Sequence, residues 1–557
     1  MKKLLYIAIF MLCTILMVAC DGSKKSFELV IDDYRELRES IFFDLTLKDD
    51  NDQLKNSEIK GEITKKGSKT VISTKDVTFS KEDKTAKEVA FKNLTAETEY
   101  TVTFYAGYNG KKEVLHTGDY KTKAEGGNTE TPYLIKTIAD LKDMKKDPKG
   151  HFKLDNDIDC ADEGFAPLFS NGTPFAGTFN GNGKKISNFT LAVKNSDTNT
   201  LTHSSQSSQY LGLFGYIGEE GSVYNLTLDS FNVMVKRTNT KETYIGLLAG
   251  YCAGTIKDIT VVNSKLDVLS EETTKDRLTV GGLVGKLAKK GTITNVTMKP
   301  GETEPKKLEI IVSSKINATV GGVVGTTADA ERFTKVENDK NVLAANISNV
   351  TFEGNITVNV SNLDANKGNA GDSQTTVAGV VGRNYSAFID ACSSKGKISL
   401  TSDFTKVGDQ GLVVAGVVGR NLSDDSRIAN CTSSSEFYLN TLDVPAKVAE
   451  GSSTTQKYLN IHVGLLVGIN NGAVSKLNYV KLDTAAYEIH VNKSGITGET
   501  EDAKFVKINV GLIAENNSQY ALENKTDKDV EFNIYSYTVG TETVVDPEPG
   551  KLTIKAE

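Results

Sequence analysis

The sequence contains no tryptophan, and among its 557 residues only nine are proline, six cysteine and five histidine. Scarce proline argues against a disordered linker protein, and 48 glycines without a collagen period exclude a triple helix. Without tryptophan the commonest stacking platform for sugars and bases is missing, so 20 tyrosines and 22 phenylalanines are left for that role. Six cysteines are too few to hold a chain of this length together through disulfides.

Charge and hydropathy place the chain among soluble multidomain proteins. Charged residues make up 25% and hydrophobic residues 38%, which provides material for a large core and, at this length, for two or more domains. The 65 basic and 72 acidic residues give a net charge of −7. This balance does not favour nucleic acid or an anionic membrane surface as the main partner.

The first 20 residues have the pattern of a secretory signal. Two lysines precede an uncharged apolar run to Ala19, and a polar stretch follows at once. A transmembrane anchor is the alternative, but the run is short for a stable span. Met17-Val-Ala-Cys20 resembles the bacterial lipobox, although leucine is usual where Met17 stands. The resemblance implies cleavage after residue 19 and lipid attachment at Cys20.

A lipid on Cys20 supplies several acyl chains, which together hold a protein on a bilayer almost permanently. We therefore expect residues 1–19 to be removed as a signal peptide and residues 20–26 to tether the mature protein. We expect the protein at the outer membrane, facing the cell exterior, with a periplasmic face as the alternative. Asp21 beside the lipid would indicate inner-membrane retention under enterobacterial sorting, a rule that varies among bacteria.

Residues 27–124 read as short alternating strands separated by turn-rich segments, which predicts a β-sandwich. Leu94 precedes Tyr100 by six residues, in a segment that resembles the tyrosine corner of fibronectin type III domains. The resemblance implies a fibronectin type III-like domain in which the tyrosine hydroxyl pins the chain back on itself. The family's core tryptophan is missing. A polar linker at residues 125–131 follows, and a different pattern begins at residue 132.

The second domain opens with a predicted amphipathic helix at residues 137–146. Thr137 is its N-cap, with an acidic residue three positions later. Strands are expected at residues 154–159 and 175–191. Within the second of these, Gly181-Asn-Gly183 predicts a tight turn that joins two strands.

From residue 211 onward one phrase recurs, consisting of glycine, two or three branched apolar residues and usually another glycine. Each of the first seven copies leads to a second strand of the type Ile-x-Asn-Val. The spacing varies too much for propeller blades, whereas a solenoid tolerates insertions that project sideways. We expect glycine to supply backbone freedom at corners and the branched residues to pack inside. The copies begin at Gly212, Gly246, Gly282, Gly322, Gly379, Gly416, Gly464 and Gly511.

These repeats and the segment before them resemble the GLUG motif of bacterial surface proteins over about residues 131–540. The resemblance implies a right-handed parallel β-helix, or β-solenoid, so the expected fold class is all-β with a β-sandwich in front. The motif is structural and transfers no catalytic residue. Equivalent residues of stacked coils form ladders about 4.8 Å apart. Cys392 and Cys431 would then replace Val296 and Val350 as buried side chains, with a disulfide as the alternative.

The repeats differ in length mainly because of insertions at one position, or slot, which lies between the end of one coil and the strand that leads into the next glycine phrase. Repetition in one slot puts these polar insertions along one side of the stack. Our hypothesis is that this fringe is the recognition surface. The alternative is that it only covers a sheet edge. The insertions are residues 194–208, 270–277, 361–373, 443–456 and 493–504.

Motifs for catalysis are missing from the sequence. It has no His-Glu-x-x-His pattern, no P-loop, and no Gly-x-Ser-x-Gly elbow with suitable partners. The densest acidic cluster could bind calcium, but alternation puts its first three members on one strand face, which favours a solvated surface. The cluster consists of Asp155, Asp157, Asp159, Asp162 and Glu163.

Arg383 and Arg420 occupy equivalent places after the closing glycines of two neighbouring copies. We interpret them as a solvated, mutually repelling pair at a corner. The sharper alternative is a site for an anionic sugar or phosphate.

The sequence favours a lipid-anchored bacterial envelope protein that binds without catalysis, as an adhesin or a scaffold that retains a glycan. This function rests on architecture and resemblance. The expected partners are the membrane, through Cys20, and a host-surface protein or glycan, with no nucleic acid, cofactor, metal or catalytic residue. The ligand-binding residues stay unassigned. The alternatives are a carbohydrate-active β-helix lyase or hydrolase, which needs acid and base groups brought together across coils, and a purely structural surface component.

Overall fold

The computed structural model describes the chain from Ser26 to Thr553. Residues 1–25, which include the predicted signal peptide and Cys20, lie outside the described part. So do residues 38, 109, 124–128, 162–163, 170–171, 195–200, 239–240, 272–277, 303–306, 329–332, 338–339, 345, 364–373, 405–410, 442–458, 476–477, 480–486, 492–505, 518–534, 539–550 and 554–557. The chain divides into two units, Met1–Gly126 and Gly127–Glu557, and each is described by itself.

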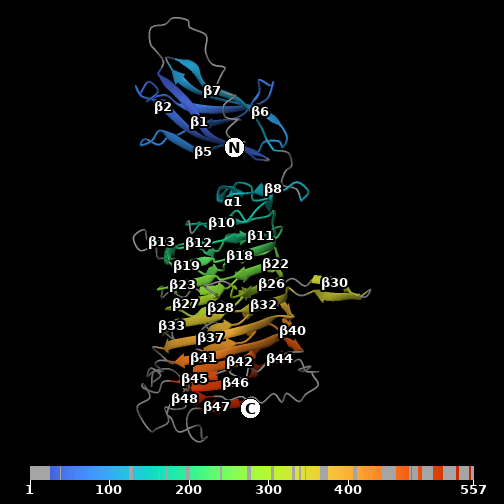
Figure 1. The fold of residues 1–557 in the computed structure, drawn as a ribbon. Coiled ribbons are helices and arrows are strands. Elements are labelled where there is room, and N and C mark those ends of the chain that lie inside the picture. The colour runs from blue at the N-terminus through green and yellow to red at the C-terminus, as the bar shows by residue number, and fades with distance from the viewer. Residues whose placement is uncertain are drawn as a thin grey trace, which may run out of the picture. The chain divides into compact units, whose positions relative to one another are not determined.

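The first unit is a sandwich of two antiparallel sheets (Figure 1). Three aromatic residues from both sheets, Phe43, Phe91 and Phe104, fill its core with no exposed surface, and the Phe43 and Phe104 rings meet edge to face at 5.3 Å. Alternation of apolar and polar residues along each strand puts the apolar side chains between the sheets. One sheet has the order β1 (Phe27–Glu36), β2 (Ser40–Asp49), β5 (Thr85–Lys92); the other has the order β4 (Val71–Asp76), β3 (Ile59–Lys65), β6 (Glu99–Tyr108), β7 (Lys111–Lys121).

Tyr100, in β6, is buried and ties the preceding segment to the sandwich. Its hydroxyl accepts a hydrogen bond from the backbone N–H of Thr95 at 2.7 Å. A buried phenol normally finds such a polar partner. The pinning of the chain that the sequence predicts at this tyrosine is therefore present.

The second unit begins with strand β8 (Tyr133–Ile135) and the predicted helix, which the structure divides into α1 (Ile138–Asp143) and the 3₁₀ turn η1 (Met144–Lys146). The expected capping box is confirmed. The Thr137 hydroxyl accepts from the N–H of Asp140 at 3.2 Å, and the Asp140 carboxylate accepts from the N–H of Thr137 at 2.9 Å. The helix thus begins at the residue that the sequence indicates.

The predicted turn at Gly181-Asn-Gly183 is wrong. Strand β11 (Thr178–Ser187) runs through this segment, and on both sides of it β11 pairs in parallel with the same neighbour, β18 (Ser222–Asp229). The register shifts between Asn180 and Lys184, and Asn182 has a φ of 55°. The segment is therefore a β-bulge, in which glycine and asparagine accommodate extra residues while the strand keeps its direction.

In the first six copies the glycine phrase begins between the first two members of a set of four strands. In the second copy they are β20 (Thr243–Ile245), β21 (Ala249–Cys252), β22 (Thr255–Val262) and β23 (Lys265–Ser270). The first two belong to a 15-stranded sheet and the last two to a 22-stranded sheet. Each pairs in parallel with its equivalents in the repeats before and after, so the sheets run along the unit (Figure 1). The predicted second strand is confirmed in the first four repeats. In the fifth and sixth it is interrupted after Asp390 and Ala429, and in the seventh residues 476–477 lie outside the described part.

Four ladders of equivalent strands result. Two of them lie in the 15-stranded sheet. The β20 ladder also contains β16 (Tyr210–Leu211), β24 (Leu278–Gly281), β28 (Ala318–Gly321), β34 (Gln374–Ala378) and β38 (Gly411–Ala415). The β21 ladder also contains β17 (Phe214–Ile217), β25 (Val284–Leu287), β29 (Val324–Thr327), β35 (Val381–Asn384) and β39 (Val418–Asn421). The long strand β42 (Leu459–Asn470) pairs with both β38 and β39, and β46 (Val506–Asn516) pairs with β42.

The 22-stranded sheet holds the other two ladders. The β22 ladder contains β9 (His151–Leu154), β10 (Ile158–Asp159), β11, β18, β26 (Thr292–Lys299), β32 (Ile347–Glu353), β36 (Phe388–Asp390), β40 (Arg427–Ala429) and β43 (Ala473–Ser475). The β23 ladder contains β12 (Thr190–Leu191), β15 (Ser204–Gln206), β19 (Asn232–Arg237), β27 (Glu309–Ser314), β33 (Asn355–Leu363), β37 (Ser393–Phe404), β41 (Thr432–Thr441) and β45 (Tyr487–Val491). The first residues of β37 and β41 continue the β22 ladder instead, and β44 (Asn478–Tyr479) pairs with those of β41 there. The C-terminal strands β47 (Tyr535–Thr538) and β48 (Lys551–Thr553) add antiparallel pairs.

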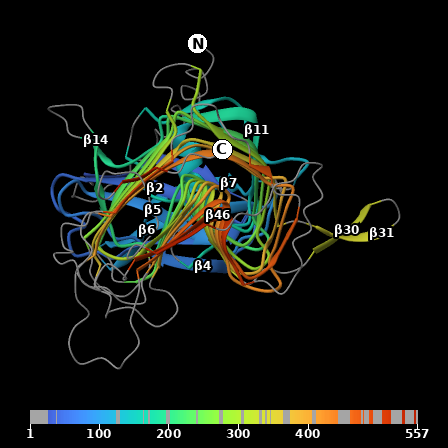
Figure 2. The same ribbon diagram turned by 90° about the horizontal axis from the view of Figure 1, so that it is seen from below.

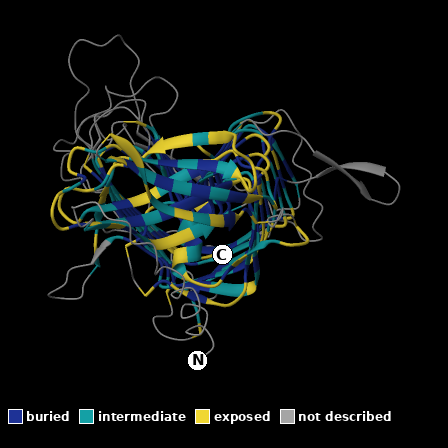
Figure 3. Ribbon diagram, turned by 90° about the horizontal axis from the view of Figure 1, so that it is seen from above, coloured by how far each residue is buried: buried dark blue, intermediate teal, exposed yellow. Residues whose placement is uncertain are grey.

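One core of buried side chains extends from Ile135 to Ile513. Along β22, Ile256, Ile259 and Val261 are buried while their neighbours are more exposed, and Figure 3 shows the same alternation of buried and less buried residues along other strands. Burial of one face of every strand against the others supplies the main driving force for folding.

The glycines of the repeated phrase have a different role from the expected one. Other glycines, such as Gly396, have positive φ angles, and Gly282 and Gly322 do not. Instead, a Cβ on Gly282 would collide with the carbonyl oxygen of Gly322, and one on Gly322 with that of Gly379. Glycine is therefore required because the backbones of adjacent repeats approach closely.

Asparagine, not glycine, provides the left-handed conformations at the bend of the second strand. Asn295 and Asn349 have φ angles of 56° and 52°, and the amide of Asn349 donates to the side-chain oxygen of Asn295 at 3.2 Å. Asparagine tolerates this conformation better than most residues do. At the equivalent place in the next repeat stands Ala391, with a φ of 51°.

Among the residues that the structure describes, two insertions form hairpins on the stack. Strands β13 (Val193–Lys194) and β14 (Leu201–Thr202) pair within the first predicted insertion. A second hairpin, β30 (Phe333–Glu337) and β31 (Lys340–Ala344), lies between β29 and β32, outside the slot that the sequence analysis singles out, and Figure 2 shows it projecting away from the stack.

Candidate functional site

The 15-stranded sheet carries tyrosines on the face that points away from the core. In β20, Ile245 is fully buried in the core, so its neighbour Tyr244 projects from the opposite face. The same alternation puts Tyr251 of β21 on that outer face. The register pairs Tyr210 with Tyr244 and Tyr216 with Tyr251, so four tyrosines from two repeats occupy adjacent rungs.

The four rings form one cluster. Tyr210 and Tyr244, one above the other in the β20 ladder, are stacked with centroids 6.0 Å apart. Tyr216 and Tyr251, in the β21 ladder, meet edge to face at 4.6 Å. Contacts also cross between the ladders, from Tyr210 to Tyr216 at 5.7 Å and from Tyr244 to Tyr251 at 6.2 Å. The bend at the glycine phrase therefore turns the two ladders toward each other.

Lys286, in β25, continues the row of Tyr216 and Tyr251. Its ammonium donates a hydrogen bond to the Tyr244 hydroxyl at 3.1 Å and lies 4.9 Å from the centre of that ring and 5.9 Å from the centre of the Tyr251 ring. Cation–π attraction and the hydrogen bond both hold the charge beside the cluster. We call these five residues, Tyr210, Tyr216, Tyr244, Tyr251 and Lys286, the Tyr–Lys face.

Three tyrosines of this face, Tyr216, Tyr244 and Tyr251, stay neutral in the ordinary pH range. Burial raises the pKa of Tyr251 to about 12, and it raises the pKa values of Tyr216 and Tyr244 as well. The neighbouring carboxylate of Glu242, which hydrogen-bonds Tyr244, adds to the effect on Tyr244. Neutral phenols can both donate and accept hydrogen bonds, so the face offers hydroxyl groups, apolar rings and one positive charge.

A pocket of about 310 Å³ continues the face toward the following repeats. Its lining includes Lys286, Arg383 and the threonine hydroxyls of two rungs. The threonines are Thr279, Thr319, Thr326 and Thr327, which are buried in the sheet. A larger pocket of about 360 Å³ lies at the start of the second unit, against Phe152, Lys153 and Tyr224. The pocket beside Lys286 combines aromatic, hydroxyl and cationic groups, as polar ligand sites do.

The equivalence of Arg383 and Arg420 is confirmed, because β35 and β39 pair them in register. The interpretation of Arg383 as a solvated side chain is wrong. Only 2% of Arg383 is exposed, and its Nη2 donates to the carbonyl oxygen of Gln374 at 2.9 Å. Arg420 is half-buried. The two arginines stand in the same row as Lys286, so this row carries three cations.

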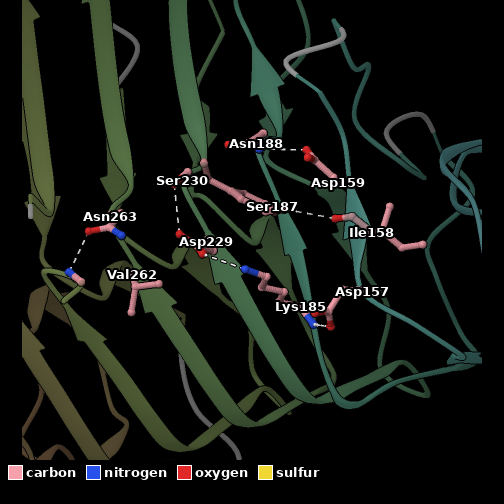
Figure 4. A network of polar contacts seen from close by, with 12 residues as sticks. Asp157, Ile158, Asp159, Lys185, Ser187, Asn188, Asp229, Ser230, Val262 and Asn263 are labelled. Atoms are coloured by element: carbon pink, nitrogen blue, oxygen red, sulfur yellow. Dashed lines mark hydrogen bonds and ion pairs between the residues drawn. The ribbon is translucent and has the colours of Figure 1, made fainter. Parts of the chain in front are cut away.

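The first three members of the acidic cluster have structural partners, and Figure 4 shows those of Asp157 and Asp159. The Asp157 carboxylate accepts from the backbone N–H of Lys185 at 2.9 Å, and Asp159 accepts from the Asn188 amide at 2.8 Å. Asp155 pairs with Lys136 at 3.6 Å. They do not share one strand, because a bend at Asp155 separates β9 from β10.

Asp162 and Glu163 lie outside the described residues. Within the described part of the chain, no group of three or more acidic, histidine or cysteine side chains could hold a metal ion.

The register places Cys392 beside Cys431 and opposite Val350 of the preceding repeat, as predicted. Both thiols are free and buried, with 1% and 0% exposed. Burial and the neighbouring thiol raise the pKa of Cys392 well above its ordinary value. The interpretation as buried side chains is confirmed, and the disulfide is not formed.

Most of the predicted fringe lies outside the described residues, as does Cys20. Among the residues that are described, no helix is long and apolar enough to cross a membrane. The fringe insertions precede the strands of the β20 ladder, which carry Tyr210 and Tyr244.

The sequence analysis did not find the Tyr–Lys face, although a signal for it exists. The residue directly after the closing glycine of each phrase is Tyr216, Tyr251, Lys286, Thr326, Arg383, Arg420 or Ile469. In this set of equivalent positions, the sequence pattern singles out only Arg383 and Arg420. Tyr210 and Tyr244 belong to the β20 ladder, and only the bend between the β20 and β21 ladders brings them against Tyr216 and Tyr251.

Two curated proteins match parts of this chain. Halomucin of Haloquadratum walsbyi is 31% identical over 164 residues, which is 27% of this chain and 2% of that protein. A protein of Evansella cellulosilytica named "Putative Gly-rich membrane protein" is 34% identical over 143 residues, which is 24% of this chain and 15% of that protein. The chain thus spans a small part of either relative. No family model and no solved structure matches it.

Proposed function

We propose that this protein is a lipid-anchored component of a bacterial cell envelope that binds a glycan without catalysis and displays it, or adheres to it, at the cell surface. The observation that carries the binding role is the Tyr–Lys face. Three half-buried tyrosines, the buried Tyr244 and Lys286 gather on the side of a sheet that points away from the main core cluster, and tyrosine combines an apolar ring with a hydrogen-bonding hydroxyl. A sugar presents the matching apolar C–H faces and hydroxyls.

For the architecture we propose a right-handed parallel β-helix of GLUG-type repeats, preceded by a fibronectin type III-like domain. The in-register parallel pairing of every strand with its equivalents supports the first part. The strand order of the two sheets in the first unit and the hydrogen bond of Tyr100 support the second. Stacked repeats of this kind provide long binding surfaces, because each contacts only its neighbours.

For the location we propose an outer-membrane lipoprotein that faces the exterior. The signal pattern and Met17-Val-Ala-Cys20 support a lipid on Cys20. One of the two similar proteins is named a membrane protein. Proteolysis of whole cells is the test: surface display predicts loss of the protein while periplasmic markers survive. Retention of the lipid label by a Cys20→Ser variant would contradict the anchor.

The binding role is tested with the full chain on an array of neutral and acidic polysaccharides. Replacing Tyr216 and Tyr251 together by alanine is expected to abolish retention. Tyr438→Ala removes a half-buried tyrosine of β41, in the other sheet and outside both pockets, and is the control. Equal binding by both variants would show that the Tyr–Lys face is not the site. Deleting the tips of the fringe at 361–373 and 493–504 tests the competing surface.

The non-catalytic part of the proposal has its own test. Uronic-acid polysaccharides incubated with the protein are expected to gain neither unsaturated products nor reducing ends. Turnover that disappears when an acidic residue of the second unit is replaced would establish a lyase or hydrolase instead.

A further inference from the structure

We propose that the Tyr–Lys face and the adjoining pocket take an acidic polysaccharide, a chain of uronic-acid residues that binds with its carboxylates toward Lys286, in the row that Arg383 and Arg420 continue. This inference rests on the proposed glycan-binding function and names the ligand class. Its elements are the placement of the cations, the free bonding capacity of Lys286, and the spacing of the rungs.

The cations lie in one row. The register runs from Tyr216 and Tyr251 to Lys286 and on to Arg383 and Arg420, all on strands of the β21 ladder. The facing row of the β20 ladder is neutral at the same rungs, with tyrosine, threonine and valine. A ligand that carries its charges along one edge and its hydroxyls along the other matches these two rows, whereas a phosphate or another compact anion would meet only one rung.

Lys286 provides the anchoring charge. An ammonium has three donors, and within the described part of the chain its hydrogen-bond partner is the Tyr244 hydroxyl. No carboxylate lies within ion-pair distance of it in that part. The acidic group on the same pocket, Glu242, hydrogen-bonds Tyr244. Two donors of Lys286 therefore remain for a ligand, and a carboxylate would form charge-assisted hydrogen bonds with them.

The rungs repeat at about the length of a sugar residue. Equivalent residues of adjacent parallel strands are about 4.8 Å apart, and one pyranose with its glycosidic oxygen advances an extended polysaccharide by a similar step. From the Tyr210 rung to the Arg420 rung the ladder has six rungs, separated by five such steps. The tyrosines would contact the first two sugars, and the pocket would hold the carboxylates that follow.

Binding of oligogalacturonate and oligomannuronate to the full chain, measured by calorimetry, tests the inference. The matched neutral ligand is the same oligomer with its carboxylates methyl-esterified. We expect the acid to bind about tenfold more tightly than the ester, and its affinity to fall with added salt, because screening weakens the charge contacts. Affinity should also rise with oligomer length up to about the number of rungs and then level off.

The variants locate the charge recognition. Lys286→Met should bring the affinity for the acid down to that of the ester and flatten the salt dependence. Lys257→Met makes the same charge change on an exposed lysine of β22, in the other sheet, and should leave both affinities unchanged. Thermal melting of each variant separates loss of binding from loss of fold, and retained binding of the ester by Lys286→Met shows that the face is intact.

Two outcomes separate this inference from the proposed function. Equal affinity for acid and ester, or neutral glycans bound while both uronates fail, would overturn the acidic ligand class and leave glycan binding standing. If the protein binds neither uronates nor any neutral polysaccharide, both proposals are wrong.

Discussion

Asn384 and Asn421 lie one above the other in adjacent repeats, and the amide nitrogen of Asn384 donates to the amide oxygen of Asn421 at 2.8 Å. Asn421 in turn donates to Asn470 at 2.8 Å, and the hydroxyl of Thr327 donates to Asn384 at 3.0 Å. All three asparagines are fully buried. Hydrogen bonds in such a chain polarise one another in the low-dielectric interior, so the ladder links four repeats.

Asn421→Leu should therefore destabilise the second unit by about 2 to 4 kcal/mol, because it leaves a buried donor of Asn384 and a buried acceptor of Asn470 each short of a partner. Urea unfolding followed by circular dichroism measures the change.

Asn359→Leu is the matched control for this substitution. Its side chain is exposed in β33, so the expected change is within about 0.5 kcal/mol. A loss at Asn421 no greater than that at Asn359 would show that the ladder does not contribute to stability.

Ala391 is the residue that breaks a second asparagine ladder. It has a φ of 51°, in line with Asn349 before it and Asn430 after it. Alanine pays about 1 kcal/mol for the left-handed conformation, which asparagine reaches more easily. Ala391→Asn should raise the free energy of unfolding by about 1 kcal/mol, as measured in urea. Ala391→Val should lower it, and a rise with valine would contradict the conformational explanation.

The repeat could be recognised in the sequence because its signals are local. The phrase beginning at Gly282 and the strand beginning at Ile293 give the strand positions, and Thr137 gives the start of the helix. The role of the glycine could not be read in this way, because the atom that forbids a side chain on Gly282 belongs to Gly322 of the next repeat. The bulge at Asn182 could not be predicted either, because only the pairing of β11 with β18 shows that the strand continues in the same direction through it.

The Tyr–Lys face escaped prediction for a related reason. Tyr251 and Lys286 are separated by a whole repeat, and each alone is an unremarkable surface residue. Their proximity follows from the parallel register, and that of Tyr244 and Tyr251 from the bend between β20 and β21. Comparing the sequences of the copies aligns Tyr251 with Lys286, but it does not reveal that Tyr244 and Tyr251 are in contact.

Stability should fall at alkaline pH because of the tyrosine cluster. Burial raises the pKa of Tyr251 to about 12, above the value of 10.0 for a free phenol. Below pH 10 the phenol is neutral in both states and its contribution is complete. As the pH rises from 10 toward 12, the unfolded chain ionises first, so the native state loses this contribution.

Urea midpoints measured from neutral pH to about pH 12 check this, together with the near-ultraviolet absorbance of tyrosinate. Tyr251→Phe should make the alkaline loss of stability shallower. Tyr34→Phe, at a side chain that is 50% exposed in the first unit, should leave it as steep as in the parent protein. The same slope in all three proteins would show that Tyr251 does not contribute.

Cys392→Val should leave stability within about 1 kcal/mol of the parent, because valine already stands at the equivalent buried place, Val350, and the two side chains are similar in volume. Cys392→Asp should instead cost several kcal/mol, since it buries a carboxylate among apolar side chains.

In the parent protein the Cys392 and Cys431 thiols are buried, and burial raises the pKa of Cys392, so a thiol reagent should modify them only as fast as the unit opens. Urea unfolding of the variants and the rate of thiol modification test both points. Rapid labelling of Cys392 in the folded protein, or a large loss of stability with valine, would show that the thiol has a role beyond packing.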